Sequence, residues 1–225
     1  KLLNDERTRS YINLNTRRTY AFKTANTFEY LELTFLEPLV KIKLDAFLIA
    51  LVICAMWFVY FSRIDIFESE PIRLTLGTVF LGGLFALIST VFYDGLTLVY
   101  PLTMGDNMLN DLIYAILHIG VVEEVVKFVP VLLVVIFSRQ VNEPVDLIVY
   151  GSLSALGFAT LENSLYFTGY GLSIAFTRFL FSTVIHMAMT SIVCYAWARA
   201  RYIKPGSTFI AIIYGLAIAS VVHGL

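Results

Sequence analysis

The first apolar stretch of the chain reads DAFLIALVICAMWFVYFS from Asp45 to Ser62 and contains no charged residue after Asp45. A helix needs roughly 20 apolar residues to cross the hydrocarbon core of a bilayer, within a range of about 17 to 25. This stretch therefore predicts a transmembrane helix. Further apolar stretches of similar length follow it at Leu74–Pro101, Asp111–Ser138, Val145–Thr168, Leu172–Ala198 and Thr208–Leu225.

The composition agrees with a chain that lies largely in lipid. Of its 225 residues, 58% are hydrophobic and only 15% are charged, which is too little charge to coat a soluble domain of this length. The fold class is all-α, and we expect a polytopic membrane helix bundle with at least six transmembrane helices over residues 44–225. Residues 1–43 are polar and of unknown role: an appendage, an interfacial helix and part of a larger domain all remain open.

Basic residues near the helix ends predict the orientation in the membrane. The loops on one side carry Arg63, Arg73, Arg139, Arg199, Arg201 and Lys204. The two loops on the other side, around Gly105 and Gly169, carry no Lys or Arg. Because Lys and Arg concentrate in cytoplasmic loops, the first side is predicted to face the cytoplasm. The basic N-terminal tail departs from this rule, as long tails can.

The third apolar stretch carries charges near its middle. It contains the run Val122-Glu123-Glu124-Val125-Val126-Lys127. Each central charge costs about 2.5–3.5 kcal/mol on insertion scales, against a gain of about 0.3–0.6 kcal/mol per Leu or Val. Lys127 can pair with Glu123 at i, i+4 or with Glu124 at i, i+3, and one glutamate is then left over. A structural ion pair with a protonated spare carboxyl is one reading, and a functional site is the other.

Each of the next three apolar stretches adds one more ionisable residue: Glu162, His186 and His223. At 1.5 Å per residue, Glu123 lies roughly 18 Å from Asp111, and Glu162 roughly 10 Å from Gly169 on the same membrane side. His223 falls roughly 8 Å from that side in a core about 30 Å thick. A lone buried histidine is often a hydrogen-bonded core residue, but similar depth predicts that all four side chains meet.

Counting charges favours a metal ion at this meeting point. The three glutamates Glu123, Glu124 and Glu162 carry two more charges than Lys127 can balance. One divalent cation would neutralise this surplus. Carboxylate and imidazole ligands suit zinc, and three protein ligands leave a position open for water. Such a water is a nucleophile, and a carboxylate beside it can serve as general base. This chemistry is typical of amide hydrolysis.

The motifs, taken in order, resemble those of PrsW-type intramembrane proteases, distant relatives of the CAAX prenyl endopeptidases. The resemblance covers about residues 47–225, although the chain ends before the acidic residue that the family carries four places after its last histidine. It rests on Glu70-Pro71, Glu123-Glu124-Val125-Val126-Lys127, Tyr150-Gly151, Gly157-Phe158-Ala159-Thr160-Leu161-Glu162-Asn163, Arg178 with His186, and His223-Gly224.

The resemblance implies an intramembrane endopeptidase of the bacterial cytoplasmic membrane that cuts membrane-anchored proteins, such as anti-sigma factors, near the extracytoplasmic face. We assign Glu123, Glu124 and Lys127 to catalysis, with Glu123 as the catalytic carboxylate. Asn163 is a candidate for steadying the oxyanion, or for an interhelical hydrogen bond. The metal ligands are predicted to be Glu162, His186 and His223, holding a divalent ion, most simply zinc.

Two other readings remain open. Relatives in the wider clan have been argued to work as glutamate proteases without a tightly held metal. Buried carboxylates and histidines also build cation or proton-coupled transporters, although neither discontinuous helices nor an inverted repeat is visible in the sequence. Besides the lipid bilayer and a protein substrate we expect no nucleic-acid partner.

Overall fold

The structure is a computed structural model that describes residues 14–63, 69–99, 105 and 107–225. These residues form helices and connections without a β-strand among them, which confirms the all-α class. The chain divides into two compact units, residues 1–42 and 43–225, and each is described by itself. In the first unit the described elements are α2 (Leu14–Lys23), α3 (Thr27–Leu31), the π-helical turn η2 (Glu32–Leu36) and α4 (Glu37–Val40).

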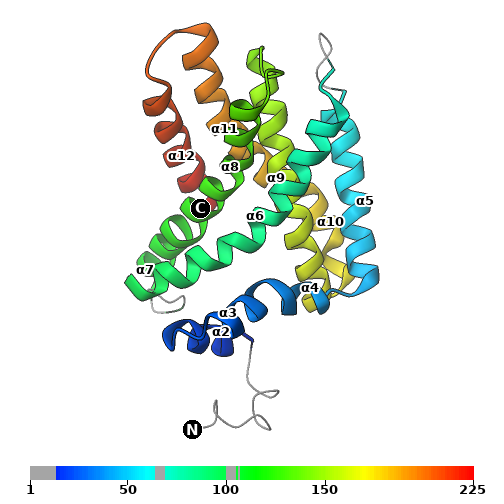
Figure 1. Cartoon of the computed structure of the whole chain (residues 1–225), viewed down its shortest axis with the longest axis vertical. Coiled ribbons are helices and arrows are strands. Elements are labelled where there is room, and N and C mark those ends of the chain that lie inside the picture. Colours follow the sequence, from blue (N-terminus) through cyan, green and yellow to red (C-terminus); the bar gives the residue numbers. More distant parts are fainter. Residues whose placement is uncertain (1–13, 64–68, 100–104, 106) are drawn as a thin grey trace. The chain divides into compact units, whose positions relative to one another are not determined.

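The second unit is a helix bundle (Figure 1). Its first half consists of α5 (Leu44–Phe61), α6 (Ile72–Val99), α7 (Met108–Ile113), η3 (Tyr114–Gly120) and α8 (Val121–Phe137). Its second half consists of α9 (Pro144–Tyr170), η4 (Leu172–Ile174), α10 (Ala175–Thr177), η5 (Arg178–Ser182), α11 (Thr183–Ala198), η6 (Arg199–Ile203) and α12 (Thr208–Gly224).

Four helical segments of the described residues are long and apolar enough to cross a membrane: Leu44–Phe61, Ile72–Thr97, Pro144–Tyr170 and Leu172–Ile203. They correspond to four of the six predicted spans. The other two predicted spans contain α8, which has 17 residues with three charges among them, and α12, an apolar helix of 17 residues. A count of at least six membrane helices therefore stays a prediction.

Helix α9 lies at the centre of this unit and packs against α5, α6, α8 and α11. Small residues let the backbones approach closely, as in many membrane helix pairs. A Cβ built on Gly157 would lie 1.8 Å from the Val79 carbonyl oxygen, and one on Gly82 would lie 2.0 Å from that of Ser154. Gly77 was expected to make such a contact too, but a Cβ there meets nothing within 4 Å, so that expectation was wrong.

Buried side chains on both sides of α9 form the core. One cluster joins Tyr150 of α9 to Phe128 of α8 and Trp197 of α11, and another joins Leu153 and Leu156 to α5 and α6. The hydroxyl of Tyr150 also donates a hydrogen bond to Glu70, the residue just before Pro71 and α6. Helices α8 and α11 therefore pack directly against α9, and α12 packs against α8 and α11.

Candidate active site

Helix α8 carries the two glutamates and the lysine at its first two turns. Lys127 and Glu124 are completely buried, and Glu123 is 6% exposed. The Lys127 Nζ lies 3.0 Å from Glu123 Oε2 and 3.0 Å from Glu124 Oε1. The lysine thus contacts both carboxylates, and the expectation that one glutamate would be left over was wrong. Charges this deeply buried are tolerated only when each is paired and hydrogen-bonded.

The two histidines of the site each place one ring nitrogen against a carboxylate. His186 Nε2 on α11 lies 2.8 Å from Glu162 Oε2 on α9, and His223 Nδ1 on α12 lies 2.8 Å from Glu124 Oε1. A carboxylate accepts hydrogen bonds, so these contacts put the ring protons on His186 Nε2 and His223 Nδ1. The lone pairs of the other two nitrogens then face the centre of the site, where Lys127 Nζ lies 2.7 Å from His186 Nδ1 and donates a hydrogen bond to it.

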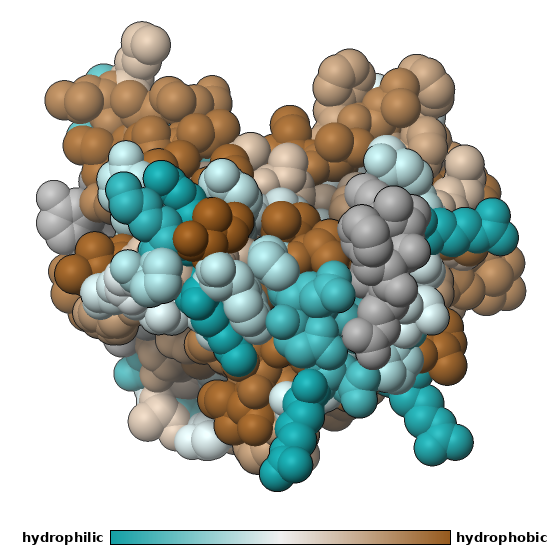
Figure 2. Space-filling view, turned by 90° about the horizontal axis from the view of Figure 1, so that it is seen from above, coloured by the Kyte–Doolittle hydropathy of each residue, from teal (hydrophilic) through white to brown (hydrophobic). Residues whose placement is uncertain are grey.

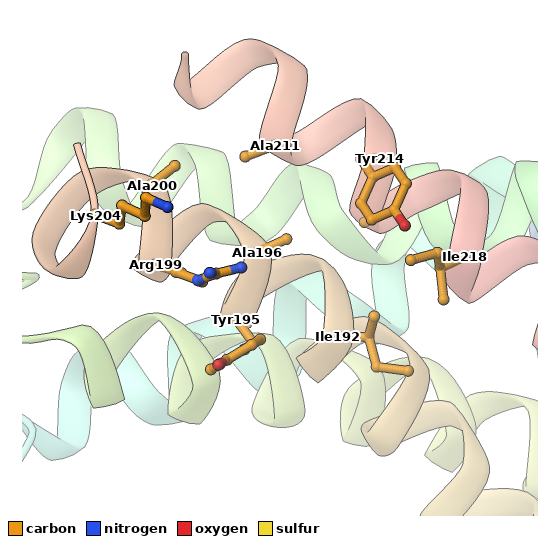
Figure 3. Close-up of a pocket in the computed structure, with 10 residues that line it drawn as sticks. Ile192, Tyr195, Ala196, Arg199, Ala200, Lys204, Ala211, Tyr214 and Ile218 are labelled. Carbon is orange, nitrogen blue, oxygen red and sulfur yellow. The ribbon is translucent and has the colours of Figure 1, made fainter. Parts of the chain in front are cut away.

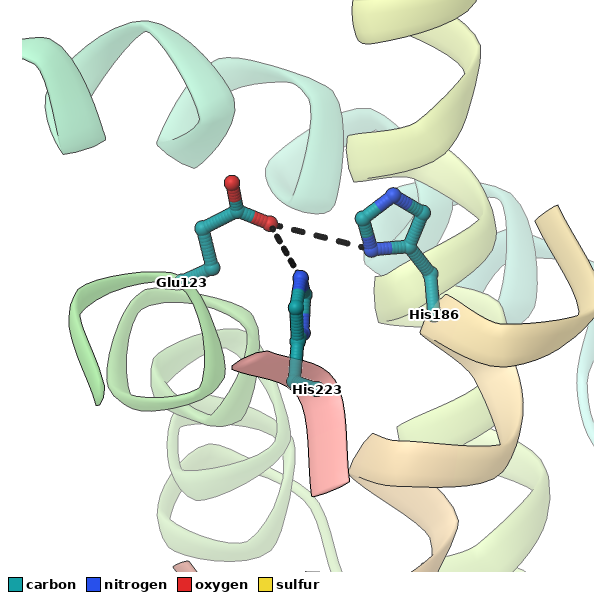
Figure 4. Close-up of side chains that lie close together, drawn as sticks. All are labelled: Glu123, His186 and His223. Atoms are coloured by element: carbon teal, nitrogen blue, oxygen red, sulfur yellow. Dashed lines mark ion pairs between the residues drawn. The ribbon is translucent and has the colours of Figure 1, made fainter. Parts of the chain in front are cut away.

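The ring nitrogens that do not face a backing carboxylate, His186 Nδ1 and His223 Nε2, point toward Glu123 (Figure 4). His186 Nδ1 lies 3.7 Å and His223 Nε2 lies 3.5 Å from Glu123 Oε2. The three residues each offer one ligand atom, and these atoms all lie within 4.8 Å of one another. Three electron-pair donors that face each other repel unless a cation or a proton donor lies between them. The Lys127 ammonium is one such cation, 2.7 Å from His186 Nδ1 and 3.0 Å from Glu123 Oε2, and the three ligand atoms could also hold a metal ion.

These residues fit a divalent metal ion. Ligand atoms about 2.0–2.2 Å from a tetrahedral zinc stand roughly 3.3–3.6 Å apart, close to the two separations from Glu123 Oε2. A carboxylate backs each imidazole: Glu162 lies behind His186, and Glu124 lies behind His223. Such carboxylates orient histidine ligands in metalloenzymes. The metal itself stays a proposal.

Glu162, which the sequence predicted as a metal ligand, is not among the three residues whose ligand atoms converge. Its Oε2 accepts a hydrogen bond from His186 Nε2 and another, at 2.5 Å, from Arg178 Nη2. Arg178 therefore counts in the charge of the site, which reduces the predicted surplus of two negative charges to one. Asn163 beside it accepts a hydrogen bond from Arg178 Nε and donates one to Thr183 Oγ1 at 3.1 Å, so it links α9 to η5 and α11.

Two site residues, Tyr93 and Thr190, were missed in the sequence. The Tyr93 hydroxyl on α6 donates to Glu123 Oε1 at 2.9 Å, and Thr190 Oγ1 on α11 donates to Glu124 Oε2 at 2.9 Å. The Phe158 ring lies 4.5 Å from Lys127 Nζ, a cation–π contact. Neutral hydroxyls and rings are common in membrane helices and give no sequence signal by themselves.

His118, the remaining histidine, is not part of the cluster. Its ring is buried and stacks on those of Tyr114 and Tyr93, with centroids 4.5 Å and 5.6 Å away.

Comparison with known proteins shows which family the chain belongs to. Residues 70–225 match the family described as PrsW family intramembrane metalloprotease. The chain belongs to the PrsW family. It is 28% identical over 172 residues to Protease PrsW of Bacillus subtilis (strain 168), which is 73% of each chain. It is 31% identical over 143 residues to Protease PrsW of Geobacillus kaustophilus (strain HTA426), which is 64% of this chain and 61% of that relative.

Membership of the PrsW family establishes the coarse function and location. The chain is a protease of a bacterial membrane, and the transporter reading gains no support from these relatives. No solved structure matches the chain.

Proposed function

We propose that this PrsW protease hydrolyses membrane-anchored proteins with water activated at the Glu123, His186 and His223 cluster. The observation that carries the proposal is the convergence of three electron-pair donors from α8, α11 and α12 within 4.8 Å. The ligand set differs from the predicted one in a single member, Glu123 in place of Glu162. A divalent ion bound there would supply a Lewis acid that activates water and polarises the scissile carbonyl.

The surrounding side chains have positioning roles in this proposal. Tyr93 and Lys127 hold the two oxygens of Glu123, and Glu124 orients His223 while it is itself held by Lys127 and Thr190. Glu162 orients His186. It is also the most accessible carboxylate of the site, with 22% of its side chain exposed, and only its Oε2 is engaged among the described residues. We assign it the role of proton acceptor from the attacking water.

A metal-free glutamate mechanism is the second candidate, and one contact favours it. Lys127 Nζ lies 2.7 Å from His186 Nδ1, so the ammonium already donates to an atom that the metal would need. In this mechanism Lys127 supplies the positive charge of the site and Glu123 is the general base. The two candidates predict the same loss of cleavage on losing Glu123 and differ in the metal content of the purified protein.

The decisive experiment combines cleavage of a co-expressed membrane-anchored reporter with elemental analysis of the purified protein. We expect Glu123→Gln to reduce cleavage at least a hundredfold while the protein stays inserted, and His186→Ala and His223→Ala to lower bound zinc and cleavage together. His118→Phe is the matched control, because it removes a buried imidazole outside the cluster and keeps the stacked ring.

Unchanged cleavage by well-expressed Glu123→Gln would refute the assigned site. Full activity after chelation and dialysis, with no zinc bound, would instead select the metal-free mechanism.

Depth predicts where a substrate is cut. Glu123 precedes the end of α8 at Phe137 by 14 residues, or about 21 Å, and that end leads to the loop of Arg139. Counted from this end, Glu123 lies about 10 Å beneath the opposite face of a core about 30 Å thick, less than the roughly 18 Å counted from Asp111, because the helical run Met108–Phe137 is longer than the core. If the basic loops face the cytoplasm, cleavage falls near the extracytoplasmic end of the substrate's membrane segment, where the helix can unwind. Product termini mapped by mass spectrometry would reveal a cut on the cytoplasmic side and so disprove this.

A further inference from the structure

A groove of about 410 Å³ lies between α11, η6 and α12, away from the catalytic cluster (Figure 3). On α11 and η6 its lining residues include Ile192, Tyr195 and Arg199, which recur every three or four residues and so share one face. Tyr214 and Ile218 line it from α12. Arg199 lies 13 residues, or about 20 Å along the helix, from His186.

The chemistry of the groove changes regularly with depth. Arg199 and Lys204 lie at the end where α11 gives way to the connection with α12, Tyr195 and Tyr214 come next, and Ile192 and Ile218 lie deepest. The distance from Arg199 to Ile192 along the helix is about 10 Å. A membrane presents the same order from the surface inward: charged headgroup, polar glycerol and ester region, then acyl chains.

The two cations of the groove are unneutralised. Arg199 and Lys204 are both exposed, and neither side chain has an ion-pair partner in the described part of the chain. None of the groove's lining residues is acidic. Both tyrosines are also more than half exposed, with hydroxyls available to donate hydrogen bonds. The groove thus offers positive charge and donors to a ligand that brings an anion.

We propose that this groove binds one anionic phospholipid from the leaflet on the basic-loop side. Arg199 and Lys204 contact the phosphate, the tyrosine hydroxyls reach the phosphate or ester oxygens, and an acyl chain lies along Ile192 and Ile218. Basic pockets between membrane helices on the cytoplasmic side are suited to such headgroups. An apolar substrate helix is a poorer match, because it would leave the two exposed cations Arg199 and Lys204 without an anion.

Lipid binding has a structural consequence for α12. This helix is anchored to α11 by Gly215, whose added Cβ would lie 2.9 Å from Val193 Cα, and it carries His223 at its far end. A lipid bridging α11 and α12 therefore stabilises the pair of helices that holds His186 and His223. We expect anionic lipid to raise the unfolding temperature of the protein.

The test uses the full chain in detergent micelles, with phosphatidylglycerol and phosphatidylcholine of identical acyl chains as probes. Native mass spectrometry measures the lipid retained, and a thermal shift measures stabilisation. Wild type should retain phosphatidylglycerol in preference to phosphatidylcholine. The double variant Arg199→Ala with Lys204→Ala should lower that retention about ten- to thirtyfold.

Two further variants make the test specific. Arg63→Ala with Arg139→Ala removes two exposed cations outside the groove at the same end of the bundle, and retention should not change. Ala211→Phe fills the groove while keeping both of its cations, and retention should fall. Equal loss in both double variants, or full retention by Ala211→Phe, would show adsorption to general surface charge and overturn the proposal.

Discussion

Helices α5 and α9 pack against each other but differ in what surrounds them. In an apolar stretch of 18 residues, 22% of the residues of α5 are buried within the protein, against 72% for α9. The buried helix is the less apolar of the two, because it carries Asp146, Glu162, Asn163 and several serines. In a soluble protein the relation is reversed, and the more buried of two helices is usually the more apolar one.

The difference shows which solvent each helix meets. Lipid solvates the apolar side chains of α5 at no cost, so burying them gains little. Polar groups find partners only inside the bundle, as Ser154 Oγ does by donating to the Lys127 carbonyl oxygen at 2.6 Å. The interior of this protein is therefore defined by polarity and small size, and the same rule places the buried Glu and His cluster of the candidate site beside α9. Three experiments test this rule.

The largest expected effect follows the loss of the buried cation. Lys127→Met leaves Glu123 and Glu124 facing each other without their ammonium partner, which should destabilise the protein by about 3–5 kcal/mol. Reversible unfolding of the purified protein in mixed micelles measures the change. Glu124→Gln combined with Lys127→Met removes one charge of each sign and should recover part of the loss. A loss below about 1 kcal/mol for the single variant would contradict the pairing.

A smaller effect is expected where α9 meets α6. Gly157→Ala places a Cβ against the backbone oxygen of Val79, which cannot rotate away, so the helices must separate at a cost of about 1–3 kcal/mol. Gly77→Ala is the matched control on α6, where the added methyl meets open space. Gly77→Ala should be neutral or stabilising by up to about 1 kcal/mol through helix propensity. Equal losses for both variants in the same unfolding assay would indicate a general effect of alanine instead of a close contact.

The sequence alone predicted the all-α class, four helices of membrane length and the ionisable residues that the structure brings together, for a physical reason. Apolar runs of about 20 residues have few alternatives to a helix in lipid, and ionisable residues within them are costly enough to stand out. Both signals depend on position along a helix. For this reason Glu123, Glu162, His186 and His223 were correctly expected to lie together.

What the sequence could not supply is the rotation of each helix about its axis. Depth placed Glu162 nearer than Glu123 to His223, which favoured Glu162 as a ligand. The structure instead turns Glu123 toward His186 Nδ1 and His223 Nε2, and Glu162 toward Arg178 and His186 Nε2. The glycine contacts failed at Gly77 for the same reason, since spacing along the chain does not say which face meets a neighbour. The tyrosine that holds Glu123 gave no signal, because its hydroxyl costs little in a membrane helix.

The smallest expected effect compares α5 and α9 directly, with one substitution made on each helix. Val149 of α9 is 1% exposed and packs in the cluster with Cys54 and Leu153, whereas Val52 of α5 is 56% exposed. An apolar side chain has nearly the same environment in lipid and in the interior, so Val→Ala loses packing and leaves a cavity but gains no penalty from water. Val149→Ala should therefore cost about 1 kcal/mol, and Val52→Ala less than about 0.5 kcal/mol, in the unfolding assay used for Lys127. Equal costs at the two positions would mean that the exposed face of α5 is covered by protein in the membrane, so that lipid does not solvate it.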